Sequence, residues 1–560
     1  MAFDRTTAYG AVRIICIAYT FFGLFIAEYP QSAVLIAPQF SGMIACSGGL
    51  AAHSSGIMGP YITVALTLTS TMKHKMYNLK SVQGSCHSKY RLFPSGRVLI
   101  LLVMFYACTS INVAFYTLNF TIACMVNATY LESQGNNSAR DPACSDRLSD
   151  TQADYGGTFT WDRNMQAFML AAESWGAVLF IFPVGILLDR FGVRWLYVVA
   201  YLATCVATAL IPMASYANPY YVVALRMLQG LSMLIAYPAC IFVATKWFPR
   251  DELGRLFAPM AAGFQVGAIL TMEISGAMCS TIGWEYVFYL AAAMILFGLL
   301  LWLLFYCDNV GSAWFLSQAE KDYIIRERNY QSKSRATIPY VKLFSSPVVW
   351  AVICSHAGTW YINYFICDFI ATYFKEALLL PTTSNGVMSG LPFIMQLIGR
   401  VAGGILSDVV QRKISPTASV KLFAAISGYI PSALILVLMV FDCTTAYSAV
   451  AVLCIAYVVF GLSIAGGPKA AVLVAPRFSG TMGCLSGMAT YVSGLVGPYI
   501  TAALTPNGTP TEWHNAFIAA AAIGFAGTTV FVVFGSGEVQ DWAKEKPDHP
   551  PYVKTDVEKF

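Results

Sequence analysis

Seven ionisable side chains stand within long apolar stretches of the sequence or, in one case, just beyond the end of one, where a charge is costly unless it has a partner or a task. They are Glu173, Arg226, Glu273, His356, Asp368, Arg400 and Lys469. At a rise of 1.5 Å per helical residue, the first three each lie roughly 10–13 Å from the same end of their helices. One arginine can neutralise carboxylates that are otherwise expensive to bury. We therefore predict that Glu173, Arg226 and Glu273 form a coupling or gating site; the alternative is a fixed ion pair that only joins helices.

The charged residues of the second half of the chain have less definite roles. Asp368 is a further coupling or gating candidate, unless it only reaches the outer interface. Lys469 either contacts an anionic substrate or extends to the cytosolic surface, and Arg400 is a substrate contact or a gating partner. Tyr364 and Ser486 offer hydroxyl groups to a substrate and are weaker candidates. His356 is expected to be a packed or interfacial residue.

The composition identifies the elements that must position these groups. Hydrophobic residues make up 57% of the 560 residues and charged residues only 11%, against roughly 25% charged residues in soluble chains. A helix needs about 20 apolar residues to cross a bilayer. Twelve stretches meet that need: 98–126, 165–188, 193–213, 219–245, 257–281, 284–307, 346–374, 384–408, 416–441, 445–466, 481–505 and 514–536.

The loops predict the orientation of these helices. The acidic connection 127–163 contains two glycosylation sequons, at Asn127 and Asn136, and so belongs on the luminal or extracellular side. Short loops on the opposite side are basic, which is the positive-inside pattern. The long basic loop 308–345 divides the twelve helices into two sets of six. The expected domains are a basic cytosolic segment 72–97, a half 98–307, a cytosolic loop 308–345, a half 346–536 and a cytosolic tail 537–560.

The first 71 residues are a copy of a later part of the chain. Residues 8–71 align without gaps to 446–509, and more than half of the positions are identical; AYGAVRIICIAY, for example, matches AYSAVAVLCIAY. This is an extra hydrophobic hairpin outside the twelve core helices. Three interpretations stay open: a fused or misjoined gene product that properly begins at Met72 or Met76, an accessory duplicated hairpin, or a functional extra module.

Two turns carry a recurring pattern of small and charged residues. The run PVGILLDRFGVR joins the second and third core helices, and a degenerate copy, GGILSDVVQRK, occupies the matching place in the second half. The small residue allows close helix contact, and the charges can form contacts that break as the two halves move. The predicted gating residues here are Gly185, Asp189, Arg190, Arg194 and Asp408.

This pattern resembles the signature of the major facilitator superfamily. Further stretches, including FTWDRNMQAFML, LRMLQGLSMLIAYPA, KWFPRDELGRL, VAPRFSGTMG and FGSGEVQDWA, are similar to the anion–cation symporter family that contains sialin, the vesicular glutamate transporters and the sodium–phosphate transporters. The resemblance covers about 96–543. It implies an all-α membrane protein with twelve core helices that rocks around a central cavity. It also implies anion contacts at Arg226 and Gln265.

The chain departs from that family at several functional positions. Thr117 stands where the family has an arginine, Met233 replaces a glutamate that serves proton coupling, and Ile241 replaces a histidine. An asparagine–histidine–leucine–aspartate run is replaced by residues 470–473. These losses put the coupling ion and the usual acidic substrates in doubt.

The leading expectation is secondary active transport of a small anionic solute, an organic anion or phosphate, coupled to an ion gradient or to membrane potential. H⁺ and Na⁺ are the candidate co-transported ions. A different class of function is a non-transporting receptor or regulatory relative. We expect no cofactor, no metal, no nucleic-acid partner and no enzymatic activity. The expected form is a monomer in the plasma membrane or in an endolysosomal or vesicular membrane.

Overall fold

The computed structural model describes residues 95–127, 144, 157–191, 193–249, 253–328 and 339–544. The copied hairpin 1–71, the basic segment up to residue 94, Asn136 and the tail from residue 545 lie outside the described residues. Predictions for these parts therefore remain predictions.

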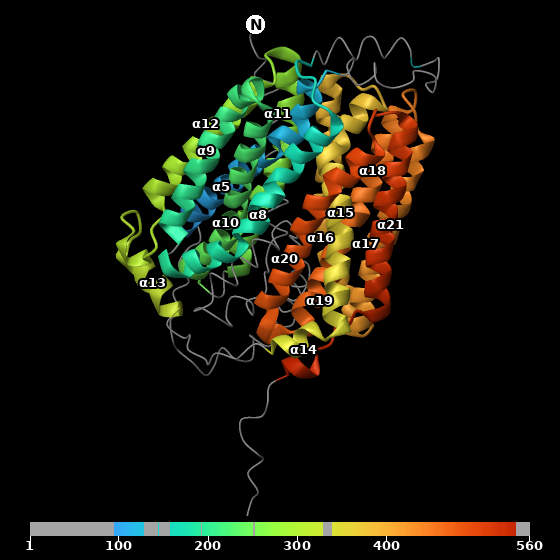
Figure 1. Ribbon diagram of the computed structural model, residues 1–560. Helices are drawn as coiled ribbons and strands as arrows, with labels where there is room; N and C mark the ends of the chain where they lie inside the picture. The colour runs from blue at the N-terminus through green and yellow to red at the C-terminus, as the bar shows by residue number, and fades with distance from the viewer. Residues whose placement is uncertain are drawn as a thin grey trace, which may run out of the picture.

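Each of the twelve apolar stretches contains a long helix, and Figure 1 shows these helices running roughly side by side. They are α5 (Gly96–Met125), α8 (Arg163–Phe191), α9 (Val193–Ala217), α10 (Pro219–Trp247), α11 (Leu253–Thr281), α12 (Glu285–Phe305), α15 (Pro347–Glu376), α16 (Thr382–Gln411), α17 (Pro416–Val437), α18 (Ala446–Gly461), α20 (Ser479–Leu504) and α21 (Pro510–Phe534). The connection between α12 and α15 contains η4 (Val310–Ser312), α13 (Gln318–Arg328) and α14 (Tyr340–Phe344). Shorter elements flank the last helices: η5 (Leu438–Val440), η6 (Leu462–Ala465), α19 (Gly467–Val474), η7 (Pro476–Phe478) and η8 (Asp541–Ala543).

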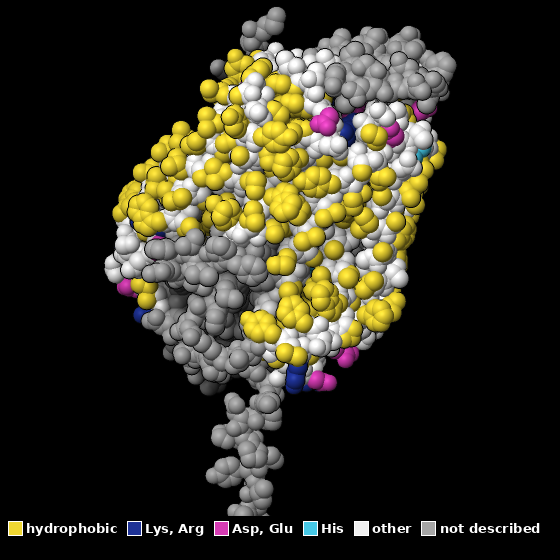
Figure 2. Space-filling view, in the orientation of Figure 1, with side chains coloured by type: hydrophobic (Ala, Val, Ile, Leu, Met, Phe, Trp, Pro, Cys, Tyr) yellow, Lys and Arg dark blue, Asp and Glu magenta, His cyan; other side chains and the backbone are white. Residues whose placement is uncertain are grey.

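Nine segments within the described residues are long and apolar enough to cross a membrane, while α8, α15 and α20 are not among them. Figure 2 shows hydrophobic side chains over most of the described part of this face, with the charged side chains near its two ends. This distribution suits a protein surrounded by lipid, because charges avoid the hydrocarbon layer.

Proline and capping residues explain where several helices begin. Proline occupies one of the first two helical positions of α10, α15, α17, α19 and α21, where its missing N–H group costs nothing. Asn218 and Ser415 cap α10 and α17 through their side chains. Thr509 and Glu512 form a reciprocal capping box at the start of α21.

The helices pack in two groups. The first group contains α5 and α8 to α12, and the second contains α15 to α21; Figure 1 shows them side by side, blue to green and yellow to red. Helices α5, α8 and α11 of the first group contact α15, α20 and α16 of the second group. We call the end where α5 stops and α8 begins the outer end, and the opposite end the inner end.

The same glycine contact recurs in both groups. A Cβ atom placed on Gly176 of α8 would lie 2.0 Å from the carbonyl oxygen of Met227, and one on Gly230 of α10 would lie 2.0 Å from the carbonyl oxygen of Glu173. In the second group, the pair Gly399 and Gly461 would meet the carbonyl oxygens of Val458 and Gln396 at 1.9 and 2.5 Å. Each pair therefore lets two helix backbones touch, which is what small residues do at helix contacts in membranes.

The tenth core helix is interrupted, although the sequence analysis expected a continuous stretch over 445–466. Helix α18 ends at Gly461, a 3₁₀ turn follows, and α19 starts at Gly467. Pro468 lacks the N–H group that would continue the hydrogen-bond ladder, and Gly466 has the non-helical angles φ −96° and ψ −111°.

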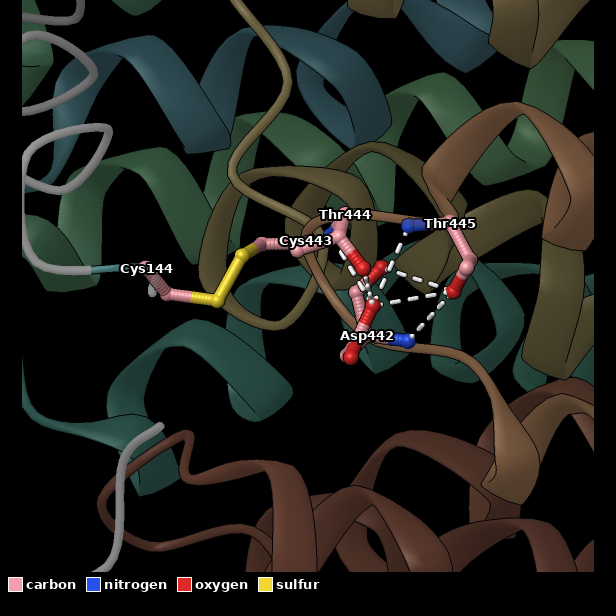
Figure 3. The surroundings of a disulfide bond; sticks show 5 residues. All are labelled: Cys144, Asp442, Cys443, Thr444 and Thr445. Carbon is pink, nitrogen blue, oxygen red and sulfur yellow. Dashed lines mark hydrogen bonds between the residues drawn. A yellow bond between two sulfur atoms is a disulfide. The ribbon is translucent and has the colours of Figure 1, made fainter. Parts of the chain in front are cut away.

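A disulfide joins the two groups at the outer end. Cys144, from the segment between α5 and α8, is bonded to Cys443, which lies between η5 and α18 (Figure 3). The next two threonines and Asp442 form a hydrogen-bonded turn around Cys443, and these hydrogen bonds lower the pKa of the Asp442 carboxyl group. The spacing of the cysteines in the sequence shows no disulfide pattern and does not predict this bond. Disulfides persist in oxidising compartments, so its position supports a luminal or extracellular outer end.

The glycine contact predicts a specific loss of stability. Gly230→Ala should lower the free energy of unfolding by about 1–3 kcal/mol, because the new methyl group meets backbone that cannot move aside. Gly497→Ala in α20 is the matched control, since its Cβ atom would lie 3.7 Å from Tyr361, an ordinary contact. Unfolding of both variants in mixed micelles tests this, and equal stability of the two would contradict it.

The disulfide predicts a pattern of thiol labelling. Cys144 and Cys443 should react with a membrane-impermeant maleimide on the outer side only after reduction. Cys443→Ser should make Cys144 reactive without reductant, which a gel shift with a polymer-linked maleimide detects. Labelling of Cys443 in the unreduced wild-type protein would contradict the bond.

Candidate functional site

The glycine contact between α8 and α10 brings Glu173 and Arg226 together. Both side chains are buried, with exposed fractions of 2% and 0%. The Nη2 atom of Arg226 lies 2.5 Å from a carboxylate oxygen of Glu173. The predicted pairing of these two residues is therefore present.

Arg226 has further partners on α5 and α10. Its Nη1 atom donates to the backbone oxygen of Phe115 at 2.8 Å and to Oε1 of Gln229 at 3.1 Å. Its Nη2 atom also donates to Oδ1 of Asn119 at 3.2 Å. Both terminal nitrogens are thus engaged within the protein, as a buried guanidinium requires. Arg226 does not line the pocket that surrounds Arg400 in the second group of helices. In this structure Arg226 is therefore not placed to contact an anion there.

Asn119 extends this chain of contacts into the second group of helices. While its oxygen accepts from Arg226, its Nδ2 atom donates to Oδ1 of Asp368 at 2.6 Å. Asp368 is also buried, with 3% exposure. We call Glu173, Arg226, Asn119 and Asp368 the bridging network. The sequence analysis gave Asn119 no role of its own, because a polar residue in an apolar helix does not reveal its partner.

Glu273 does not join this network, contrary to the prediction. Its side chain is exposed and lies beside Gly390 of α16, where a Cβ atom would come within 3.6 Å of the Glu273 Cγ atom. The predicted depth along α11 says nothing about the direction in which the side chain points around the helix. On α11 that direction is toward α16.

A small pocket lies within the second group, where α18 is interrupted. Its polar lining includes Ser355, His356, Thr359, Arg400, Ser427 and Ser463. Trp360 and Phe460 supply aromatic surface. His356 is nine residues from the start of α15, which places this part of the pocket roughly 14 Å from the inner end.

Arg400 connects this pocket to the first group. Its Nη1 atom donates to Oε1 of Gln265 on α11 at 2.9 Å. The Nε2 atom of Gln265 in turn donates to Oε1 of Gln396 at 3.1 Å. The structure thus brings together two of the predicted substrate-binding residues, Arg400 and Gln265. A guanidinium beside hydroxyl groups can bind a carboxylate or another anion.

The remaining predicted substrate contacts lie away from this pocket. Lys469 is buried and donates to Oγ of Ser407 at 2.7 Å, so it does not extend to the surface. Tyr364 is packed where Gly494 allows α20 to approach α15 and Ser174 of α8. Ser486 is buried in α20, with 2% exposure. None of the three lines the pocket.

Of the predicted gating residues of the two turns, Gly185, Asp189, Arg190 and Asp408 lie on helices α8 and α16, but their side chains are outside the described ones. The guanidinium carbon of Arg194 lies 5.6 Å from the ring centre of Trp195. Within the described residues, no group of three His, Cys, Asp or Glu side chains could hold a metal ion.

Further contacts between the two groups lie at the outer end, and the sequence analysis did not find them. Arg163 of α8 binds both carboxylate oxygens of Glu376 of α15, at 2.7 and 2.8 Å. The adjacent Lys375 donates to the backbone oxygens of Ala123 and Val126 of α5. Together with the disulfide, these contacts hold the outer ends of the two groups together.

Comparison with known proteins agrees with this architecture. The family model of the Major Facilitator Superfamily matches residues 98–498. The chain belongs to the Major Facilitator Superfamily. Human sialin is 29% identical over 389 residues, which cover 69% of this chain and 79% of sialin. The mouse probable small intestine urate exporter is 28% identical over 444 residues, covering 78% of this chain and 90% of the exporter.

Solved structures of the superfamily have a similar fold. A bacterial homolog of the human lysosomal transporter Spinster, in an inward-facing and unoccupied conformation, matches with a TM-score of 0.55 at 13% identity. The match covers 78% of this chain and 96% of that one. The expected membership in the sialin-like group of the superfamily is thus confirmed, at modest identity. The protein is a multi-pass membrane transporter and not an enzyme, and the alternative of a non-transporting relative is not favoured.

The ion pair of the bridging network can be measured directly. Glu173→Gln and Arg226→Gln should each lower the free energy of unfolding by about 3–5 kcal/mol, because each leaves a buried charge without its partner. The double variant should lose less than the sum of the two. Asp541→Asn, at an exposed ion pair with Lys544, is the control and should leave stability unchanged. Strict additivity of the two single variants would contradict the pairing.

Proposed function

We propose that this protein moves a small organic anion across the membrane by alternating access, and that the pocket around Arg400 is its binding site. The observation that supports this most directly is the composition of that pocket. One guanidinium, three serine hydroxyl groups and one threonine hydroxyl group surround it, beside two aromatic rings. Such a lining suits an anion with a polar, partly planar body better than a bare inorganic ion.

The name of one relative supports the same class of substrate. The mouse relative is named a probable small intestine urate exporter, and urate is an organic anion. Because Arg226 is engaged within the protein, we assign the anion contact to Arg400 with Gln265. Three residues remain secondary candidates for contact with the substrate in another conformation of the transporter: Lys469, Tyr364 and Ser486.

Alternating access also fits the contacts between the two groups. We propose that all twelve long helices cross the membrane, with α8, α15 and α20 tolerating polar residues because they pack between the groups. The halves 98–307 and 346–536 would then rock against each other, with Gly185, Asp189, Arg190, Arg194 and Asp408 as inner gating residues. The joined outer ends and a pocket nearer the inner end correspond to a state closed to the outside.

Several finer assignments belong to this proposal. The transport is symport with a cation, driven by an ion gradient or by the membrane potential, and a monomer suffices. The membrane is the plasma membrane or an endolysosomal or vesicular membrane. Asn127 lies two residues after the end of α5, and its backbone pairs with Phe159. Asn127 and Asn136 are the two proposed glycosylation sites. Residues 1–71 have no assigned role.

Uptake into proteoliposomes tests the proposal. Sialic acid, urate, glutamate and phosphate are each offered under proton, sodium and voltage gradients. Arg400→Gln should reduce uptake of the transported anion at least tenfold, because one charge-assisted contact is worth on the order of 1.5–3 kcal/mol. Arg400→Lys keeps the charge but loses the planar fork and should be intermediate.

Lys413→Gln is the control for lost positive charge, because Lys413 is exposed near the inner end of α16. Its uptake should equal that of the wild-type protein. Full uptake by Arg400→Gln would contradict the assignment of the binding site. Absence of gradient-driven uptake of every anion by folded wild-type protein would contradict anion transport itself.

A further inference from the structure

The bridging network contains one positive and two negative side chains. Arg226 is the cation, and Glu173 and Asp368 are the carboxylates. All three are buried, with exposed fractions of 0, 2 and 3%. If every group were ionised, the network would hold one surplus negative charge on buried side chains, which is costly.

The groups that face Asp368 do not remove this charge. Tyr116 of α5, Tyr364 and Cys367 of α15 and Tyr457 of α18 lie close enough to interact with its charge. These groups are neutral at ordinary pH. From the first group of helices, Arg226 of α10 and Glu173 of α8 complete the surroundings.

The nearest further cations are engaged elsewhere. Arg400 donates to Gln265, and Lys375 donates to two backbone oxygens at the outer end of α5. Lys375 also stands beside Glu376, whose charge is matched by Arg163. Neither cation makes an ion pair with Asp368 among the described residues.

We propose that Asp368 is a proton-binding site and that this outer-closed structure holds the proton. Oδ1 of Asp368 accepts from Asn119 at 2.6 Å, so the proton belongs on Oδ2. Glu173 is the ionised partner, because it lies 2.5 Å from Arg226. One bound proton makes the network electrically neutral.

This site also has the position of a gate. Asp368 belongs to the second group of helices, while Asn119, Arg226 and Glu173 belong to the first. Opening the outer end separates Asp368 from Asn119. Loss of the proton restores a buried surplus charge and favours the opened, hydrated state, whereas proton binding from the outer side favours closure. This consequence rests on the proposed alternating access, but the existence of the proton site does not.

Infrared spectroscopy of the purified full-length protein at neutral pH tests the site without any substrate. The wild-type spectrum should contain the C=O band of a protonated carboxylic acid that Asp368→Asn lacks. Glu538→Gln, which replaces an exposed carboxylate outside the membrane helices, should keep that band. Glu173→Gln removes the surplus carboxylate, so Asp368 should ionise as the partner of Arg226 and the band should weaken. If Asp368→Asn does not fold, Asp368→Glu should shift the band instead of removing it.

Two results would overturn the proposal. A band that Glu173→Asp shifts and Asp368→Glu leaves in place would put the proton on Glu173. Identical wild-type and Asp368→Asn spectra in this region would mean that the closed network keeps its surplus charge or neutralises it with another cation. In the latter case, sodium should raise the unfolding temperature of the wild-type protein and not of Asp368→Asn.

Transport measurements distinguish the existence of the proton site at Asp368 from its proposed role in proton coupling. For any anion that the wild-type protein carries, Asp368→Asn should lose proton-driven accumulation while retaining exchange of labelled for unlabelled anion. Accumulation equal to that of the wild-type protein would contradict proton coupling at Asp368. Failure of the wild-type protein to carry any anion would contradict the proposed function and leave the infrared result to decide the proton site.

Discussion

A guanidinium buried in the middle of a membrane protein must have partners, and the arrangement of the first group of helices depends on supplying them to Arg226. Its partners come from α5, α8 and α10. They can reach it only because Gly176 and Gly230 let the α8 and α10 backbones touch. An arginine so placed fixes the relative position of three helices, since moving any one of them would leave a buried donor or a buried carboxylate alone.

The second group repeats this backbone contact with different side chains, and the difference separates two tasks. At the repeated crossing, Gln396 stands where α8 has Glu173, and Tyr457 stands where α10 has Arg226. Arg400 follows Gly399, whereas the small Ala177 follows Gly176. The first crossing is therefore locked by charge. The second is neutral at its centre and presents its arginine to the pocket, where an incoming anion can compete for it.

The sequence was sufficient for the helices and for the pairing of Glu173 with Arg226, and insufficient for contacts between distant helices. Apolar length and proline positions determine the helix bounds to within a few residues, except in the tenth core helix, where α18 stops early at Gly461. Depth along a helix follows from residue number, but the direction around it does not, which is why Glu273 was wrongly included. Asn119 with Asp368, Arg163 with Glu376 and Cys144 with Cys443 join residues more than 200 positions apart. No local pattern predicts such pairs.

The covalent and the non-covalent contacts at the outer end have different consequences for movement. Cys443 stands in a hydrogen-bonded turn directly before α18, but Cys144 is separated from residue 157 by 12 residues of the chain, 145–156. The disulfide thus links the connection between α5 and α8 to the turn before α18 and joins no two helices directly. The ion pair of Arg163 with Glu376 and the hydrogen bond of Asn119 with Asp368 join the helices themselves. Opening of the outer end therefore requires that these two contacts break.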